Sequence, residues 1–486
     1  MNPVIGLVVL AAVIVLILLI LKKQPVWLAL LSAGTVGIVL LSGSDVALGT
    51  LGTLAFSTIS QYAYVVIPLF ILMGALVSKS GVAEDVFAVA AKVTRRLPGG
   101  LGVATVLACG GFAAVTGASA ATVATVGRVS VSQMARYGYR RDAAGALVAM
   151  GGTLGVLIPP SVLIVVLGIV SGESIGRLLL AGVIPGIVTM FIYALFTIGL
   201  ARLGFFRRRE APTSDGVRVH EPALAGATSA AEDGGKELTG SGRPAGGAGD
   251  GADTGNPAAP AERITLKHLI GTAHVTALFA VIFGGIYSGV LTVTESGAIA
   301  AAAATVILVI RCRRNLRQAW RSSKEALLET GSLASMIFAL IIGGSVFAYF
   351  IARSGVPVWI SDMIAAAGLP PLAIVIAGLV VMLILGSFLD SYSILILTVP
   401  LLYPILSAQG VDGIWFGILA VKAIEIGLVT PPFGLNVFVI SGVVPGLKAE
   451  RVFRYVVPFV LADLVAIGVL IAFPSIVTWL PEVAFA

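Results

Sequence analysis

The sequence has few charged residues and few of the side chains that enzymes use for metal or redox chemistry. Charged residues make up 11% of the chain, whereas a soluble domain contains about 25%. Its two cysteines, Cys109 and Cys312, stand far apart, and its three histidines show no metal-ligand spacing. These shortages argue against a soluble fold, a disulfide framework and a protein metal cluster, and we expect no bound cofactor.

Motifs for ATP hydrolysis and for nucleophilic catalysis are also missing. The sequence contains no GxxxxGK[ST] phosphate-binding loop and no nucleophile–histidine–acid pattern. We therefore expect neither an ATPase nor any other enzyme. The net charge of +7 is explained by Lys and Arg gathered on one membrane side, without a nucleic-acid partner.

Apolar sequence is what the chain has in abundance. Hydrophobic residues make up 58% of it, and the mean hydropathy is +1.05. Apolar runs of about 20 residues, the length that spans a bilayer, recur throughout. The run Val4–Leu21 has no basic segment before it, so we interpret it as a first membrane helix rather than a signal peptide. The pattern predicts an all-α polytopic membrane protein with about eleven or twelve transmembrane helices, embedded in lipid.

Basic segments alternate along the chain with loops that contain few cations. Placing the basic segments in the cytoplasm puts both chain termini outside. The first helix then runs inward, the second (about Val26–Leu41) returns after Lys22-Lys23, and the third (about Tyr62–Val77) runs inward again. The amphipathic stretch Lys79–Gly99 is expected to lie along the inner membrane surface.

Residues 207–263 differ in composition from the rest of the chain. Gly, Ala, Pro, Ser and acidic residues dominate, and aromatic residues are absent. Such a segment cannot bury enough apolar surface to offset its ordering entropy. We interpret it as a disordered cytoplasmic linker between two membrane halves, 1–206 and 264–486.

An internal repeat relates the two halves. Gly155–Ser161 reads GVLIPPS, and Gly427–Phe433, 272 positions later, reads GLVTPPF. A double proline inside an apolar helix removes backbone donors and breaks the helix. The pattern predicts broken helices at about 143–170 and 412–440, which the charge topology makes antiparallel. Inverted repeats with broken helices are typical of secondary transporters.

An apolar segment with a polar centre precedes each broken helix. The first, about 100–135, has Gly and Thr near its middle, and the second, about 370–408, contains GSFLDSYS. Each must enter and leave the membrane on the same side for the topology to close. We interpret both as re-entrant helical hairpins whose tips meet the broken helices near the membrane midplane, because irregular backbone is tolerated there only inside protein or beside a cavity.

Two groups of oxygen-bearing residues are candidate sodium sites, because hard cations favour carbonyl, hydroxyl and carboxylate oxygens. The first group is Thr116, Ser119, Thr122, Gly151, Gly152 and Thr153. The second is Ser387, Asp390, Ser391 and Thr430. We place the substrate region between them, at Pro159, Pro160, Ser161, Pro431, Pro432 and Asn436. The alternative is that small hydroxyl residues serve as packing positions between membrane helices.

Charged residues in apolar segments have structural alternatives. Asp390 suggests function by its depth, although its carboxylate can also cap the helix that follows by accepting from Tyr392 or Ser393. Lys422 and Glu425, three residues apart, are interpreted as a structural ion pair rather than a proton relay. We expect Thr294 to be the N-cap of a helix whose first turn contains Glu295.

The motifs together resemble the large membrane subunit of TRAP (tripartite ATP-independent periplasmic) transporters, within the ion-transporter superfamily. The resemblance covers nearly the whole chain outside the linker. It rests on GGTLGVLIPPS, AGVIPG, GGIYSGVLTVTESGAIA, GSFLDSYSILILTVPLLYPI and IEIGLVTPPFGLNVFV, in that order. Departures are Val293 and Ser391, where the family usually has Pro, and the long linker.

This resemblance implies an elevator-type importer with scaffold and transport domains in a bacterial inner membrane, where the outside placement of the termini that the charge pattern predicts would be periplasmic. It implies sodium coupling and an organic acid substrate, such as a C4-dicarboxylate or a sugar acid. It also implies two partners, a small four-helix membrane subunit and a soluble periplasmic binding protein. The alternative is a stand-alone ion-coupled carboxylate symporter of the same superfamily, which would work without a binding protein.

Overall fold

A computed structural model describes residues 3–206 and 265–485 of the chain. Within those ranges the elements are α-helices and one short 3₁₀ segment, with no β-strand, which confirms the all-α class. Eight described helices are long and apolar enough to cross a membrane, or nine if one bent pair counts as a single span, and four shorter apolar helices accompany them. The predicted linker, 207–263, lies outside the described residues.

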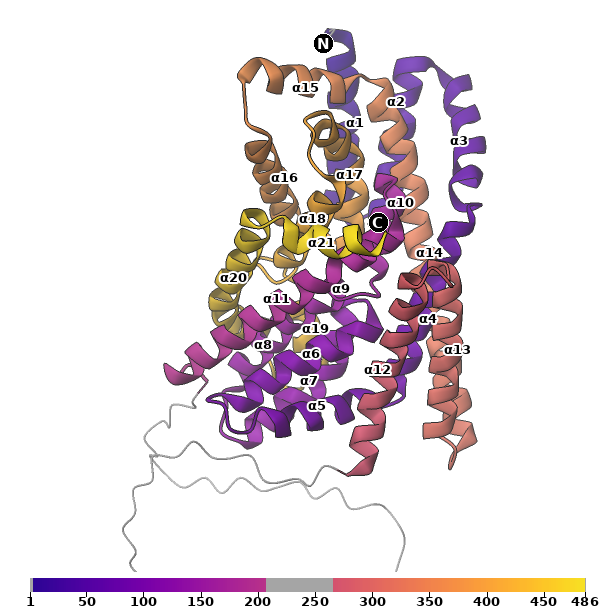
Figure 1. Ribbon diagram of the computed structural model, residues 1–486. Helices are drawn as coiled ribbons and strands as arrows, with labels where there is room; N and C mark the ends of the chain where they lie inside the picture. Colours follow the sequence, from indigo (N-terminus) through magenta and orange to yellow (C-terminus); the bar gives the residue numbers. More distant parts are fainter. Residues whose placement is uncertain (1–2, 207–264, 486) are drawn as a thin grey trace, which may run out of the picture. The chain divides into compact units, whose positions relative to one another are not determined.

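Figure 1 shows how the helices of the two described ranges are arranged. The first range contains α1 (Pro3–Leu21), α2 (Val26–Ser42), α3 (Ser44–Ile59), η1 (Tyr62–Val65), α4 (Val66–Lys79), α5 (Val82–Val93), α6 (Gly100–Thr116), α7 (Ser119–Arg136), α8 (Arg141–Gly152), α9 (Leu154–Leu157), α10 (Val162–Ser171) and α11 (Ile175–Arg202). The second contains α12 (Leu266–Tyr287), α13 (Val293–Arg311), α14 (Leu316–Arg353), α15 (Val356–Ala367), α16 (Pro371–Gly386), α17 (Ser391–Ala408), α18 (Gly413–Gly427), α19 (Leu435–Val443), α20 (Ala449–Ala472) and α21 (Ser475–Ala484).

Helices from both halves form one bundle around the long helix α14, which packs against α2, α3 and α4. Gly34 of α2 lies against the backbone of α14, where an added Cβ would be 2.8 Å from the Phe347 nitrogen. Gly343 of α14 lies in the same way against the Trp27 carbonyl. Small residues let membrane helices approach closely. We call α1–α4 and α12–α14 the scaffold bundle.

One helix and one helix boundary differ from those expected from the sequence. The stretch between the second and third expected helices was not predicted as a helix, yet it forms α3, which packs on α2 and α14. Its mixture of Gly, Ser and Thr weakens the apolar signal, and contact with α14 compensates. The N-cap of α13 is Thr292 rather than Thr294, because Glu295 closes a capping box with the residue three positions before it.

The scaffold bundle carries a repeated junction. Ser80, after α4, and Ser354, after α14, each donate a hydrogen bond of 2.7 Å to the carbonyl three residues earlier. Each is followed by a glycine in the left-handed region, Gly81 (φ 73°) and Gly355 (φ 68°). A left-handed glycine turns the chain sharply without a Cβ penalty. The turns begin α5 and α15, two helices of 12 residues each.

Each half continues with a helix pair and an interrupted helix. The pairs α6–α7 and α16–α17 lie across the ranges expected for the two hairpins. In the first interrupted helix, α8–α9 and α10 are bent by 47°. Both double prolines stand at the interruptions, and both Pro-Pro bonds are cis. The part after each interruption packs on the other half, α10 against α17 and α19 against α7, so the two repeats interlock.

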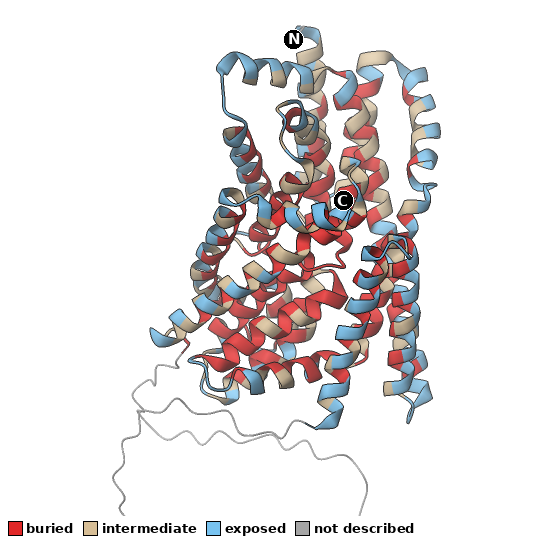
Figure 2. Ribbon diagram, in the orientation of Figure 1, coloured by how far each residue is buried: buried red, intermediate tan, exposed pale blue. Residues whose placement is uncertain are grey.

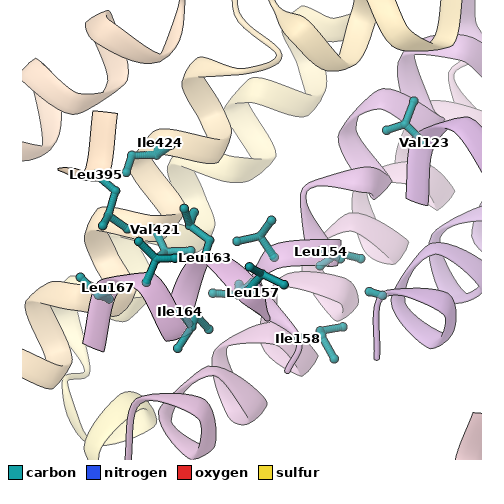
Figure 3. Packing of buried hydrophobic residues seen from close by; sticks show 14 of the residues in the cluster. Val123, Leu154, Leu157, Ile158, Leu163, Ile164, Leu167, Leu395, Val421 and Ile424 are labelled. Carbon is teal, nitrogen blue, oxygen red and sulfur yellow. The ribbon is translucent and has the colours of Figure 1, made fainter. Parts of the chain in front are cut away.

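Burial is greatest where these interlocked elements meet. Every residue of α9 and most residues of α8, α10 and α18 are buried, whereas the outward faces of the scaffold bundle are exposed (Figure 2). Close by, Leu154, Leu157 and Leu163 from the first repeat pack in one cluster with Val421 and Ile424 from the second (Figure 3). The apolar packing surrounds the first interruption, whose residues 158–161 are all buried.

Candidate functional site

The tip of the first helix pair packs directly onto the first interruption. Gly117, at the tip, adopts φ 62°, and an added Cβ there would lie 2.5 Å from the Pro160 carbonyl oxygen. The Val162 N–H donates to the Gly117 carbonyl at 3.4 Å. Ser161 is fully buried and accepts from the Ile164 N–H at 3.3 Å, so it caps α10. We call each tip together with the interruption beside it a half-site. The first half-site is closed by backbone contact between its tip and its interruption.

The structure brings most of the first candidate sodium group together. The Thr116 and Thr122 hydroxyls lie 2.8 Å apart, both buried. An added Cβ on Gly152 would lie 3.2 Å from the Ser119 carbonyl oxygen, so α8 passes close to the tip. Gly151 faces the sulfur of Cys109 instead, where an added Cβ would be 2.9 Å away.

Thr153, the sixth residue of that group, belongs to a different network. Its hydroxyl lies 2.9 Å from the Tyr193 hydroxyl and donates to the Met150 carbonyl at 2.7 Å. It is not among the groups that meet at the first tip, and its place in a sodium site remains a proposal.

Asp390 at the second tip caps the helix that follows, as the alternative interpretation held. Its Oδ1 accepts from the N–H groups of Tyr392 and Ser393, both at 3.1 Å, and its Oδ2 accepts from the Ser393 hydroxyl. The carboxylate is only partly buried. Asp390 is therefore the N-cap of α17, with both of its carboxylate oxygens accepting hydrogen bonds.

The helices around the second tip approach each other closely. Gly386 ends α16 and Gly427 ends α18, and an added Cβ on Gly427 would lie 2.5 Å from the Gly386 Cα. Ser387 follows and is buried. Thr430 donates its hydroxyl to the Ile426 carbonyl at 2.7 Å, so its oxygen lone pairs stay available. The second candidate sodium group thus has its hydroxyls and its carboxylate beside a backbone-to-backbone contact.

The second interruption differs from the first in exposure. Pro431, Pro432 and Phe433 are exposed, whereas Pro159 and Pro160 are buried. The Phe433 ring is paired with the exposed ring of Phe388 at the second tip, with centroids 5.9 Å apart. The described residues therefore bury the first interruption and leave the second, with its two aromatic rings, uncovered.

Asn436 joins the two interrupted helices. Its Nδ2 donates to the Ala149 carbonyl on α8 at 3.4 Å. Its Oδ1 is buried and has no hydrogen-bond partner among the described residues. A buried amide oxygen without a donor is costly, and a cation or a ligand N–H or O–H group would satisfy it.

The expected ion pair between Lys422 and Glu425 is wrong. Lys422 forms its ion pair with Asp463 of α20 and also donates to the Tyr193 hydroxyl at 3.2 Å. The Tyr193 hydroxyl in turn donates to Asp463. Residues three apart on a helix diverge by about 60°, which points the two side chains to different neighbours. The sequence did contain a signal for this partner, because Asp463 is an acidic residue within an otherwise apolar span.

Glu425 is instead directed to the two tips. It is 1% exposed, and its Oε1 accepts from the Ser391 hydroxyl at 3.1 Å. The Ser119 hydroxyl interacts with the same carboxyl group, while Oε2 has no well-formed hydrogen bond within the described residues. Sequence reasoning did not place Glu425 in the site.

The donor set suits a hard monovalent cation better than a transition metal. Within residues 3–206 and 265–485, no group of three or more His, Cys, Asp or Glu side chains is arranged to hold a metal ion. Hydroxyls, interrupted-helix carbonyls, one tip carboxylate and the orphaned Asn436 oxygen are available. Such oxygen ligands are the type that sodium accepts when it loses water.

Known proteins resemble this chain along nearly its full length. The family described as "Tripartite ATP-independent periplasmic transporter, DctM component" matches residues 13–476. The "C4-dicarboxylate TRAP transporter large permease protein DctM" of Pseudomonas aeruginosa is 31% identical over 458 residues, covering 93% of this chain and 92% of that protein. The "Sialic acid TRAP transporter large permease protein SiaM" of Vibrio cholerae is 27% identical over 424 residues, covering 87% of each.

A solved structure has a similar fold. The YdaH transporter of Alcanivorax borkumensis, whose crystal structure is described as having an unusual topology, superposes with a TM-score of 0.58 over 93% of this chain and 98% of that one. The two sequences are 15% identical, so this likeness concerns the fold alone.

Proposed function

Because this chain belongs to the DctM family of tripartite ATP-independent periplasmic transporters, we propose that it imports an organic acid across a bacterial inner membrane, driven by a sodium gradient. The relatives are named as transporter permeases, and the chain is a permease subunit rather than an enzyme. The observation that carries the sodium proposal is the meeting of two tips and two helix interruptions around buried oxygen groups.

Sodium coupling is supported by the chemistry of both half-sites. Thr116 and Thr122 supply hydroxyl oxygens beside carbonyls freed at the first interruption. Asp390 supplies a capped, partly exposed carboxylate at the second tip. Half-helix ends and freed carbonyls hold coupling ions in transporters of this general architecture. Each ion that binds would draw a tip toward its interruption.

The substrate is proposed to bind between the half-sites, in the region that the two interruptions and Asn436 form. Phe388 and Phe433 provide an apolar edge there. The family is tripartite, so we propose two partners, a small four-helix membrane subunit and a periplasmic binding protein that delivers the acid. The names of the two relatives support a C4-dicarboxylate or a sugar acid as the class of substrate.

Alternating access is proposed to occur by an elevator motion. The two helix pairs and the two interrupted helices interlock through α10 with α17 and α19 with α7, so they can move as one transport domain. The scaffold bundle packs around α14 and would stay fixed in the membrane. In the proposed orientation both termini are periplasmic and the two repeats are inverted.

Uptake into proteoliposomes tests this function. The chain is reconstituted with its small subunit, and loaded binding protein is added outside. We expect uptake of labelled acid only with an inward sodium gradient, with potassium or choline at equal ionic strength as the control. Uptake that persists without sodium would contradict the coupling, and uptake without binding protein would favour a stand-alone symporter.

A further inference from the structure

Glu425 has no acidic counterpart at the equivalent position of the first repeat, which lies 272 positions earlier. The same shift that takes Ser119 to Ser391 takes Thr153 to Glu425. Ser119 and Ser391 are each the first residue of the second helix of a pair, α7 and α17. The two serines are therefore equivalent, whereas the carboxylate is present in one repeat.

Both equivalent serines meet at this single carboxylate. The Ser391 hydroxyl donates to Glu425 Oε1 at 3.1 Å, and the Ser119 hydroxyl interacts with the same group. All three side chains are buried. A hydroxyl that donates a hydrogen bond to a carboxylate keeps its oxygen lone pairs free for a cation, and its oxygen becomes a stronger ligand.

The Glu425 carboxyl group is also left without a bonded cation. Lys422, one turn away, forms its ion pair with Asp463. Glu425 Oε2 is buried and lacks a hydrogen-bond partner in the part of the chain that the structure describes. A buried carboxylate in this condition is costly unless a positive charge approaches. Bound cations at the tips would offset that cost.

We propose that Glu425 is a positioning residue shared by the two sodium half-sites, which orients the Ser119 and Ser391 hydroxyls toward the ions and supplies one buried negative charge to both. This inference rests on the proposed sodium coupling. It differs from a local structural role, because it predicts that one substitution on α18 weakens sodium binding at both tips.

Sodium-dependent thermal unfolding of the purified chain in lipid nanodiscs tests the proposal without transport. The midpoint sodium concentration for stabilisation is measured with choline replacing sodium. We expect E425Q to raise this midpoint by about tenfold or more, the loss typical when a group that orients metal ligands is removed. E425D keeps the charge but shortens the reach, and it should show a smaller increase.

The control is Glu173→Gln. Glu173 also accepts a hydroxyl hydrogen bond from α17, through Tyr403 at the opposite end of that helix. E173Q should leave the sodium midpoint unchanged. If E425Q is not recovered folded, E425D decides, since its midpoint must rise for the proposal to stand.

A double-substitution cycle separates a shared role from two independent ones. S119A and S391A should each raise the sodium midpoint, and each should have a much smaller effect when combined with E425Q, because Glu425 acts through these two hydroxyls. Full additivity would overturn the shared role. If sodium stabilises the unsubstituted chain but E425Q has the same midpoint, the role of Glu425 is overturned and the sodium coupling still stands. If the unsubstituted chain is not stabilised by sodium, both the coupling and the inference fail.

Discussion

Asp390 caps a helix with the same side chain that we propose as a sodium ligand. Its Oδ1 satisfies two N–H groups at the start of α17, which is the role of an N-cap. The residue is partly exposed. Capping requires only an acceptor oxygen, whereas sodium binding benefits from the full charge, so the two roles can be separated by substitution.

Asp390→Asn and Asp390→Ala should therefore have different effects. Asn retains the acceptor, so we expect stability close to that of the unsubstituted chain, with sodium-driven uptake reduced about tenfold or more through loss of charge. Ala removes the cap as well and should cost about 1 kcal/mol of stability. Thermal unfolding and proteoliposome uptake measure the two effects. Near-normal uptake by D390N would reduce Asp390 to a structural cap.

The charged residues also show where reading the sequence succeeds and fails. Asp390 precedes an apolar run at a turn, and local spacing was enough to anticipate its bonds to Tyr392 and Ser393. The partner of Lys422 is Asp463, 41 positions further along the sequence. Local spacing favoured Glu425 because nothing in a single sequence reports which distant helix lies opposite. Pairings between elements depend on packing that the periodicity does not encode.

At the scale of elements, the contact of α16 with α18 depends on two glycines. An added Cβ on Gly427 would lie 2.5 Å from the Gly386 Cα and 2.7 Å from the Leu383 carbonyl oxygen. Both neighbours are backbone atoms, so neither can turn aside as a side chain would. The hairpin helix and the interrupted helix are therefore held at the distance that brings Ser391 to Glu425.

Gly427→Ala should separate these helices. We expect a loss of about 1–3 kcal/mol in stability, typical of an overpacked contact, and a weaker response of the melting temperature to sodium. Gly468→Ala is the matched control, because a Cβ at that helical position of α20 would meet nothing within 4 Å. Equal melting temperatures for the two variants would contradict the close packing.

The elements themselves were largely predictable, and their exceptions have a physical cause. The double prolines located both interruptions, and composition located the Gly- and Ser-rich tips. The helix α3 was missed because its sequence is weakly apolar and its stability comes from contact with α14. The sequence also did not predict that the second interruption is exposed, because the two Pro-Pro motifs are nearly identical.

At the scale of the whole described molecule, the two half-sites differ in access. Ser161 and Phe433 occupy equivalent positions of the repeat, 272 residues apart. Ser161 is fully buried, while Phe433 is 58% exposed. The described residues therefore cover the first interruption and leave the second uncovered.

Cysteine labelling measures this difference directly. In a background with Cys312→Ser, the remaining native Cys109 is buried. We expect Phe433→Cys to react with a small maleimide and Ser161→Cys to remain unlabelled, because a buried thiol is out of reach of the reagent. Unfolding in detergent should make both reactive, which controls for the reagent. Equal labelling of the folded variants would contradict the asymmetry.

The helices α5 and α15 have equal length, about 18 Å at 1.5 Å per residue, and in Figure 1 they lie across the other helices at opposite edges of the view. Their attachments are unequal. Arg311 pairs with Asp85 of α5 at 2.6 Å and donates to the Ser80 carbonyl at the preceding turn at 2.7 Å, whereas α15 has no buried residue. If α5 and α15 were attached equally, the proposed transport domain could move along the membrane normal without rotating. Because α5 is held more firmly than α15, we expect the proposed elevator motion to include a rotation about α5.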